Sequence, residues 1–110
     1  MNFLFIETSV FNRSRHDLMR DDELHEFQVW LLQNYELGDT IAGTSGCKKV
    51  RWSRPGTGKS GGVRVIYYVQ TQRDRIYLLI MYPKSRQDNL SDGQKSQLKG
   101  VIQQINQCSL

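Results

Sequence analysis

The sequence predicts an α+β fold: a small antiparallel or mixed β-sheet with N-terminal helices and a C-terminal helix. Apolar residues recur at helical spacing near both ends of the 110-residue chain, and segments rich in β-branched and aromatic residues fill its middle. The links between the middle segments are short, which favours antiparallel pairing. With 38% hydrophobic residues the chain can form one core, so we expect a single domain over residues 1–110.

The N-terminal elements are a strand and two helices. Asn2 to Glu7 is a compact apolar run, typical of a strand that is buried on both faces. A short helix should follow, because Thr8 or Ser9 offers a hydroxyl group as its N-cap. A clearer helix begins at Asp21, where acidic residues fill the first turn and apolar residues recur every three or four positions. Gly38 ends this helix or lies just beyond it.

The rest of the chain predicts a meander and a final helix. Gly38 to Gly46 is a loop with at most a short strand around Ile41. The three strand-like segments that follow are Cys47 to Ser53, Val63 to Gln70 and Arg75 to Tyr82. A helix is expected from about Asp92 to Asn106, since Ser91 and Gln94 have capping-box spacing. We expect the helices to cover one face of the sheet and to leave the other partly free.

Charge is distributed unevenly along the chain. Residues Met1 to Gly46 carry three basic and eight acidic side chains, a net charge of −5. Cys47 to Arg86 carry ten basic residues against one aspartate, a net charge of +9, and the tail after Arg86 is neutral. A segment this basic attracts polyanions, although a charge run can also be no more than a solvated surface. Because these charges lie on the expected strands and their loops, nucleic acid is the favoured partner.

Several other classes of protein do not fit the sequence. No apolar stretch is long enough to cross a membrane, and the N-terminus lacks the features of a secretory signal, so a cytoplasmic location is expected. Cys47 and Cys108 have no partner at metal-ligand spacing, and we interpret both as reduced thiols. His16 and His25 lie in the acidic half, far along the chain from the basic strands. No metal ligand set or small-molecule cofactor is expected, which favours metal-free chemistry.

One segment imitates a nucleotide-binding motif. Ser53 to Ser60 (SRPGTGKS) nearly matches the pattern G-x-x-x-x-G-K-[ST], but its first residue is serine. A true phosphate-binding loop leads into a helix, whereas glycines and a β-branched strand follow here. We therefore interpret the segment as a basic hairpin loop in which Arg54 and Lys59 contact a nucleic-acid backbone.

Strand geometry predicts that several cations converge. Alternate residues of a strand share one face, so Lys49 and Arg51 project together and their apolar neighbours point the other way. If the strands pair in sequence order, Arg51, Arg64 and the segment Tyr82 to Arg86 meet at one edge of the sheet. Taken singly, each cation could merely solubilise the surface, and Tyr82 could merely pack at a strand end. Their convergence favours a site.

Three stretches carry a resemblance to a known family: LGDTIAGTSGCKKVRW (Leu37 to Trp52), PGTGKSGGVRVIYY (Pro55 to Tyr68) and YLLIMYPKS (Tyr77 to Ser85). In their order and spacing the chain resembles the RelE/HigB superfamily of toxins from bacterial type II toxin-antitoxin systems, most closely the HigB-type branch. The resemblance implies a ribosome-dependent mRNA endonuclease, or mRNA interferase, that inhibits translation. It also implies attack of a ribose 2′-OH on the adjacent phosphate, and inhibition by an antitoxin, expected to be of the helix-turn-helix type.

The resemblance also implies roles for single residues. Lys49 becomes the candidate general base, and Arg64 is expected to bind the phosphate and stabilise the transition state. Lys84 becomes the general acid or a phosphate clamp, and Tyr82 stacks on a base or orients the 2′-OH. The residues expected to contact RNA or the ribosome are Lys48, Arg51, Arg54, Lys59 and Arg86.

Some positions depart from the family pattern, and two other functions stay open. RelE-type proteins commonly have arginine where this chain has Ser85, and a stacking aromatic residue where it has Asn89 and Leu90. A ParE-like inhibitor of DNA gyrase belongs to the same superfamily, but that branch tends to lack the basic set. A non-catalytic RNA-binding or ribosome-associated module would need the charge without groups for proton transfer.

Overall fold

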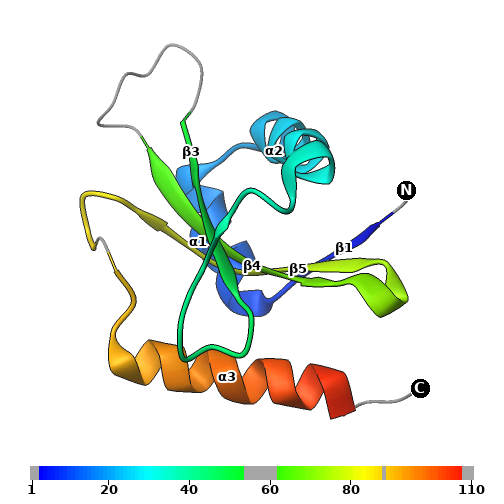
Figure 1. Ribbon diagram of the computed structural model, residues 1–110. Coiled ribbons are helices and arrows are strands. Elements are labelled where there is room, and N and C mark those ends of the chain that lie inside the picture. The colour runs from blue at the N-terminus through cyan, green and yellow to red at the C-terminus, as the bar shows by residue number, and fades with distance from the viewer. Residues whose placement is uncertain (1–2, 54–61, 88, 108–110) are drawn as a thin grey trace.

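The fold is a five-stranded mixed sheet with helices on both of its faces (Figure 1). The structure is a computed structural model, and it describes residues 3–53, 62–87 and 89–107. The strands are β1 (Leu4–Glu7), β2 (Asp39–Thr40), β3 (Lys48–Trp52), β4 (Val63–Gln70) and β5 (Arg75–Pro83), in the spatial order β1-β5-β4-β3-β2. The helices are α1 (Ser9–Leu18), α2 (Asp21–Asn34) and α3 (Asp92–Gln107). β1 pairs with β5 in parallel and the other pairs are antiparallel, which confirms the predicted α+β class.

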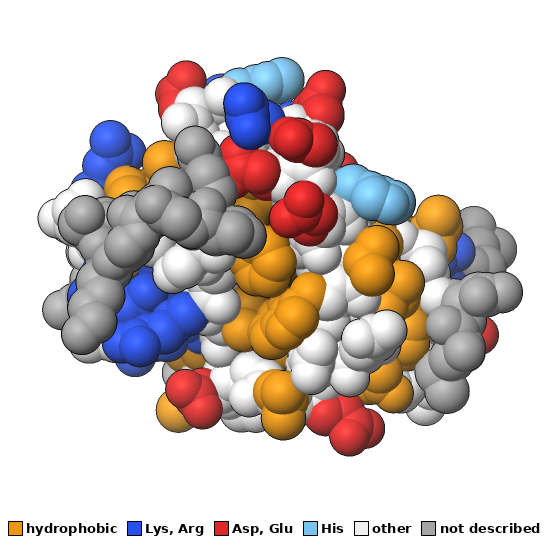
Figure 2. Space-filling model, turned by 90° about the horizontal axis from the view of Figure 1, so that it is seen from above, with side chains coloured by type: hydrophobic (Ala, Val, Ile, Leu, Met, Phe, Trp, Pro, Cys, Tyr) orange, Lys and Arg blue, Asp and Glu red, His pale blue; other side chains and the backbone are white. Residues whose placement is uncertain are grey.

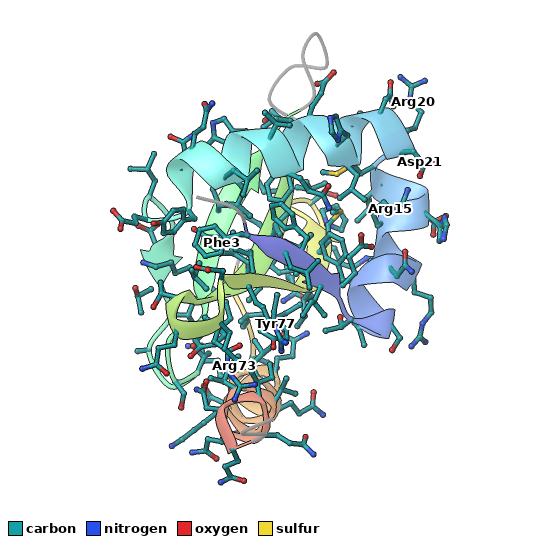
Figure 3. The ribbon with its side chains drawn as sticks, turned by 90° about the vertical axis from the view of Figure 1, so that its right-hand side faces the viewer. Phe3, Arg15, Arg20, Asp21, Arg73 and Tyr77 are labelled. Atoms are coloured by element: carbon teal, nitrogen blue, oxygen red, sulfur yellow. The ribbon has the colours of Figure 1, made fainter. Side chains whose placement is uncertain are left out.

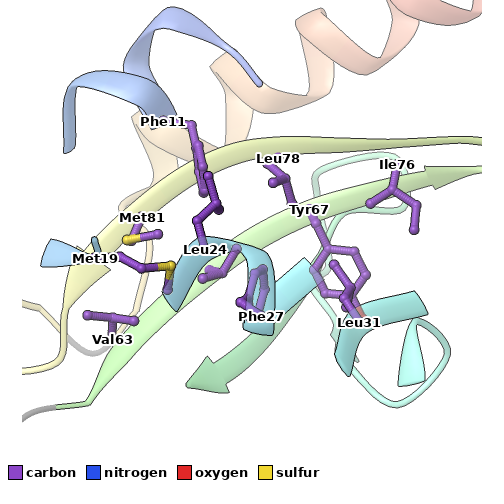
Figure 4. Packing of buried hydrophobic residues seen from close by; sticks show 11 residues of the cluster. Phe11, Met19, Leu24, Phe27, Leu31, Val63, Tyr67, Ile76, Leu78 and Met81 are labelled. Atoms are coloured by element: carbon purple, nitrogen blue, oxygen red, sulfur yellow. The ribbon is translucent and has the colours of Figure 1, made fainter. Parts of the chain in front are cut away.

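Two apolar clusters hold the helices to the sheet. The first lies between the sheet and helices α1 and α2, and includes Phe11, Phe27 and Tyr67 (Figure 4). The second lies on the opposite face, where α3 covers the sheet (Figure 3), and it includes the buried residues Leu98 and Ile102 of that helix. The prediction that helices cover only one face is therefore wrong. β4 and β5 are almost continuously apolar, and such strands need cover on both sides.

The predicted helix caps are present. The Thr8 hydroxyl accepts a hydrogen bond from the amide of Phe11 at 3.0 Å and donates one to the carbonyl of Leu79 at 2.7 Å. The amide of Gln94 donates to the Ser91 hydroxyl at 3.1 Å, and the amide of Ser91 donates to the Gln94 side chain at 3.0 Å. Both helix starts follow the sequence expectation, and Thr8 also ties α1 to the sheet.

Two N-terminal expectations need correction. Leu4 is 61% exposed, so β1 is not buried on both faces, because it is an edge strand that pairs only with β5. Helix α2 ends at Asn34, well before Gly38. Gly38 serves a different purpose: a Cβ atom at this position would overlap the hydroxyl of Tyr67. The glycine is required by close packing rather than by the end of the helix.

Polar contacts fix α2 and the connection that follows it. The Tyr67 hydroxyl donates a hydrogen bond to the carbonyl of Tyr35 at 2.8 Å and accepts one from the amide of Gly38 at 3.2 Å. At the other end of α2, Arg15 and Asp21 form an ion pair that joins α1 to α2 (Figure 3). The contacts of Tyr67 hold the segment between α2 and β2 against β4, the middle strand of the sheet.

Candidate active site

The three central cations come from strands that pair directly. In β3, Val50 and Trp52 pack against the first apolar cluster, so Lys49 and Arg51 project from the opposite face. The register places Arg51 opposite Arg64 of β4. A fourth cation, Lys84, follows the end of β5, and its backbone amide donates a hydrogen bond to the carbonyl of Gly62 at 3.2 Å, beside the start of β4.

These four cations line one open cleft of about 790 Å³. Its lining residues are Trp30, Leu37, Gly38, Asp39, Lys49, Val50, Arg51, Arg64, Lys84 and Asn89. A smaller hollow of about 350 Å³ also involves Arg51, Arg64 and Lys84. In Figure 2, Lys and Arg side chains gather in one patch with hydrophobic side chains beside it, while the main group of acidic side chains lies at another edge of the same face. The predicted convergence of these cations is therefore present.

Arg64 is the buried cation of this cleft. It is only 6% exposed, and no carboxylate within residues 3–53, 62–87 and 89–107 forms an ion pair with it. Arg51 lies directly across from it, and side chains in such antiparallel positions have Cβ atoms about 4.5–5.5 Å apart. Like charges at this spacing repel each other, and a buried charge without a counterion is costly. An anion in the cleft would relieve both effects.

Other cleft residues were not predicted from the sequence. Lys49 donates a hydrogen bond from Nζ to Oδ1 of Asn89 at 3.3 Å, which links β3 to the segment before α3. Asp39 pairs with Lys49 in the register of β2 and β3. Among the described residues that line the cleft, Asp39 is the one with a carboxylate side chain. Trp30 and Leu37 add an apolar side. No local pattern in the sequence indicates that α2 and its following segment reach this cleft.

The comparison with family models decides the assignment of the chain. Residues 5–109 match the model of the RelE toxin of the RelE/RelB toxin-antitoxin system. The chain belongs to the RelE toxin family. Its partner is therefore an antitoxin, while membership of the HigB-type branch stays a prediction.

Three predicted residues of this RelE-family toxin do not line the cleft. Tyr82 is opposite Arg64 in the register but is 5% exposed within the second apolar cluster, which leaves little ring surface for stacking on a base. Lys48 donates hydrogen bonds from Nζ to the carbonyl of Gly38 and to the Thr40 hydroxyl, each at 3.3 Å. Arg86 lines a separate hollow beside α1. The predicted contacts of Arg54 and Lys59 fall outside the described residues.

Titratable groups outside the cleft have structural surroundings. Burial raises the pKa of the Cys47 thiol, with a smaller opposing effect from a hydrogen bond to Thr44. Burial likewise raises the pKa of the Tyr67 hydroxyl. His16 and His25 are exposed on α1 and α2, and Cys108 lies outside the described residues. Among the described residues, no three His, Cys, Asp or Glu side chains gather in a way that could hold a metal ion.

No helix in the described part of this RelE-family toxin combines the length and apolar character needed to span a membrane.

Proposed function

We propose that this toxin cuts mRNA in the decoding site of the ribosome, without a metal, and so inhibits translation in the cytoplasm. The observation that carries the proposal is Arg64, a buried cation that faces Arg51 and has no carboxylate partner among the described residues. Chains rarely keep such an arrangement unless an anion completes it. A phosphodiester supplies the missing charge and accepts hydrogen bonds from guanidinium groups in paired geometry.

The reaction balances with groups in the cleft. A base takes the proton of the 2′-OH, the 2′-oxygen bonds to phosphorus, and the bond from phosphorus to the 5′-oxygen breaks as an acid protonates the leaving oxygen. The products are a 2′,3′-cyclic phosphate and a 5′-OH. Arg64 and Arg51 stabilise the charge that develops on the phosphorane, and Lys84, which lines the same cleft, acts as the acid.

Two cleft residues can serve as the base. Lys49 can take the proton as a neutral amine, and Asp39, its cross-strand neighbour, can take it as a carboxylate. The variants Lys49→Met and Asp39→Asn, made separately, show which residue is the base through the pH profile of the cleavage rate. Loss of the base removes one limb of that profile, whereas loss of a phosphate contact lowers the rate at every pH.

The decisive experiment is primer extension on an mRNA translated in a purified system, compared with the same mRNA without ribosomes. We expect cuts only within the decoded frame and only when ribosomes are present. Lys84→Met should reduce cutting by about 10²–10⁴-fold, the usual contribution of a general acid. Lys99→Met, an exposed lysine on α3, removes the same charge away from the cleft and should leave cutting unchanged.

Two outcomes would contradict the proposal. A non-catalytic ribosome-binding module would stall translation without producing new mRNA ends, and Lys84→Met would then change only a salt-dependent affinity. A ParE-like gyrase inhibitor would leave mRNA intact and block DNA supercoiling by purified gyrase. The basic cleft disfavours the gyrase alternative. The helix-turn-helix type of the antitoxin is part of the same proposal and can be tested by identifying the protein that co-purifies with the toxin.

A further inference from the structure

Trp30 presents a rigidly held aromatic ring to the basic cleft. The ring stacks on Phe27, with ring centroids 6.2 Å apart and planes at 26°. Its centroid also lies 5.9 Å from the ring centroid of Trp52. Phe27 is completely buried, so these contacts anchor Trp30 from the side of the first apolar cluster. Trp30 itself is only partly buried, and it lines the same cleft as the cations.

Leu37 extends this apolar side of the cleft. Leu37 is 69% exposed, which is more than any other large hydrophobic residue in the described part of the chain. A single exposed leucine is common on protein surfaces and carries little by itself. Here it lies next to Gly38, whose position is fixed by the hydroxyl of Tyr67, and it lines the cleft together with Trp30. The cleft thus has a cationic side and an apolar, aromatic side.

We propose that Trp30 and Leu37 receive the nucleobase next to the phosphate that the cations bind. The inference rests on the proposed function, since it assumes that the ligand is RNA. A nucleotide joins an anionic phosphate to a flat, largely apolar base, and a cleft of about 790 Å³ is within the ~300–1,000 Å³ range of ligand pockets. Single-stranded RNA is commonly bound by cations along the backbone with aromatic rings under the bases.

The segment between β5 and α3 supplies no aromatic ring to this cleft, since residues 84–91 include none. Asn89 and Leu90 occupy that region, and Asn89 makes a hydrogen bond to Lys49 instead of offering a ring. Helix α2 supplies the ring from the other side of the cleft. Because every base has a stackable face, this contact should tolerate different bases while still requiring one.

The test uses two RNA hexanucleotides with 2′-O-methyl groups, which cannot be cut, one with its bases and one with every base replaced by hydrogen. The chain has two tryptophans, so Trp52→Phe leaves Trp30 as the only indole and Trp30→Leu leaves Trp52. At low salt the intact oligonucleotide should quench the fluorescence of Trp52→Phe but not that of Trp30→Leu. The wild type should bind it about 5- to 150-fold more tightly than the abasic one.

Matched variants make the result specific. Trp30→Leu should lose most of the preference for the intact oligonucleotide, whereas Trp30→Phe should keep it, because the ring is retained. Val29→Ser changes an exposed apolar residue of the same helix that does not line the cleft, and it should behave as wild type. Melting temperatures of all variants separate lost stacking from lost folding.

Several outcomes would overturn the proposal. Equal binding of both oligonucleotides to the wild type, including no binding of either, would show that no base is received. If Trp30→Leu weakens the binding of both oligonucleotides equally, the Trp30 ring only packs against its neighbours and does not stack on a base. If Trp30→Leu instead weakens antitoxin binding and keeps the base preference, this side of the cleft contacts protein. If the wild type cuts mRNA normally but gives any of these results, the nucleobase contact is wrong and the proposed nuclease function stands. If it prefers the intact oligonucleotide but does not cut mRNA, the nuclease function is wrong and the nucleobase contact stands.

Discussion

At the scale of single residues, Arg64 shows function opposing stability. It is buried, lies across from Arg51, and forms no ion pair with a carboxylate in the described part of the chain. Desolvation of its guanidinium group and repulsion from Arg51 both act against the folded state. Binding sites commonly retain such unfavourable arrangements because the ligand supplies the compensating charge.

Replacing Arg64 should therefore not destabilise the toxin. We expect Arg64→Met to leave the free energy of unfolding unchanged or to raise it by roughly 1–3 kcal/mol, as apolar replacements of buried charges often do. Inorganic phosphate should raise the melting temperature of the wild type and have much less effect on the variant. Urea unfolding and thermal melts measure both effects, with Arg75→Met, at the far end of the sheet, as the control. A large loss of stability in Arg64→Met would identify a structural role.

Burial of two acids predicts a loss of stability at alkaline pH. Burial raises the pKa of the Cys47 thiol above its ordinary value of 9.0, and that of the Tyr67 hydroxyl above its ordinary value of 10.0. Above those values the unfolded chain loses protons that the folded protein keeps. The contribution of these two groups to the free energy of unfolding is therefore complete below about pH 9 and is lost as the pH rises. Urea unfolding between pH 7 and 10.5 should show this decline, beginning at higher pH in Cys47→Ala. A decline identical in both proteins would contradict the assignment to Cys47.

At the scale of elements, the connection between α2 and β2 shapes one side of the cleft. Tyr67 holds it through its hydrogen bonds to Tyr35 and Gly38, and Leu37 and Asp39 flank that glycine in the cleft lining. Lys48 adds a hydrogen bond to the Gly38 carbonyl. The site therefore depends on a packing contact between β4 and the segment that leads to Asp39, one of the two candidate bases.

A substitution pair tests this contact. Gly38→Ala should destabilise the protein by about 1–3 kcal/mol, because its Cβ atom would overlap the Tyr67 hydroxyl. Tyr67→Phe alone should also destabilise, by about 1–3 kcal/mol, through loss of two partly buried hydrogen bonds. Combined, the two changes should cost less than their sum, since the phenylalanine removes the oxygen that the new methyl group meets. Additive losses in urea unfolding would show that the overlap does not govern this position.

Local patterns predicted the elements but not what they meet across the sheet. The Ser91 and Gln94 capping box and the span of β4 followed from spacing and residue type alone. The requirement for Gly38 and the approach of Trp30 to the cleft depend on partners distant in sequence, which no periodicity encodes. The convergence of the cations was predictable because strand alternation and pairing order determine it. The places of Tyr82 and Arg86 were not, since the apolar cluster and α1 decide them.

At the scale of the whole molecule, the uneven charge of the chain is also uneven on its surface. The acidic first turn of α2 and the basic strands are separate elements, and in Figure 2 the basic patch and the main group of acidic side chains lie at different edges of one face. Such a field attracts RNA toward the cleft and speeds association at low ionic strength. Arg51, Arg64 and Lys84 also line a hollow, so this part of the sheet is open to a ligand.

Salt dependence should locate the RNA on this face. Removing two phosphate contacts with Arg51→Met plus Arg64→Met should reduce the slope of log affinity against log salt concentration by about 1.4, or about 0.7 per contact for a single strand. Lys95→Met plus Lys99→Met removes the same charge from α3 and should leave the slope nearly unchanged. Equal changes in both pairs would mean that RNA binding follows net charge and not the cleft.

The central claim is that Arg64 and its neighbouring cations bind and activate one RNA phosphodiester without a metal. The most direct measurement is the single-turnover rate of mRNA cutting on programmed ribosomes. The ribosomes are first loaded with mRNA and then transferred to a buffer that contains a chelator and only the magnesium needed to keep them assembled. The chemistry of the new mRNA ends is then analysed. We expect 2′,3′-cyclic phosphate and 5′-OH ends, and a rate at least about 10²-fold lower in Arg64→Met than in Arg75→Met. Cutting that is equally fast in Arg64→Met, or ends that carry a 5′-phosphate, would contradict the claim.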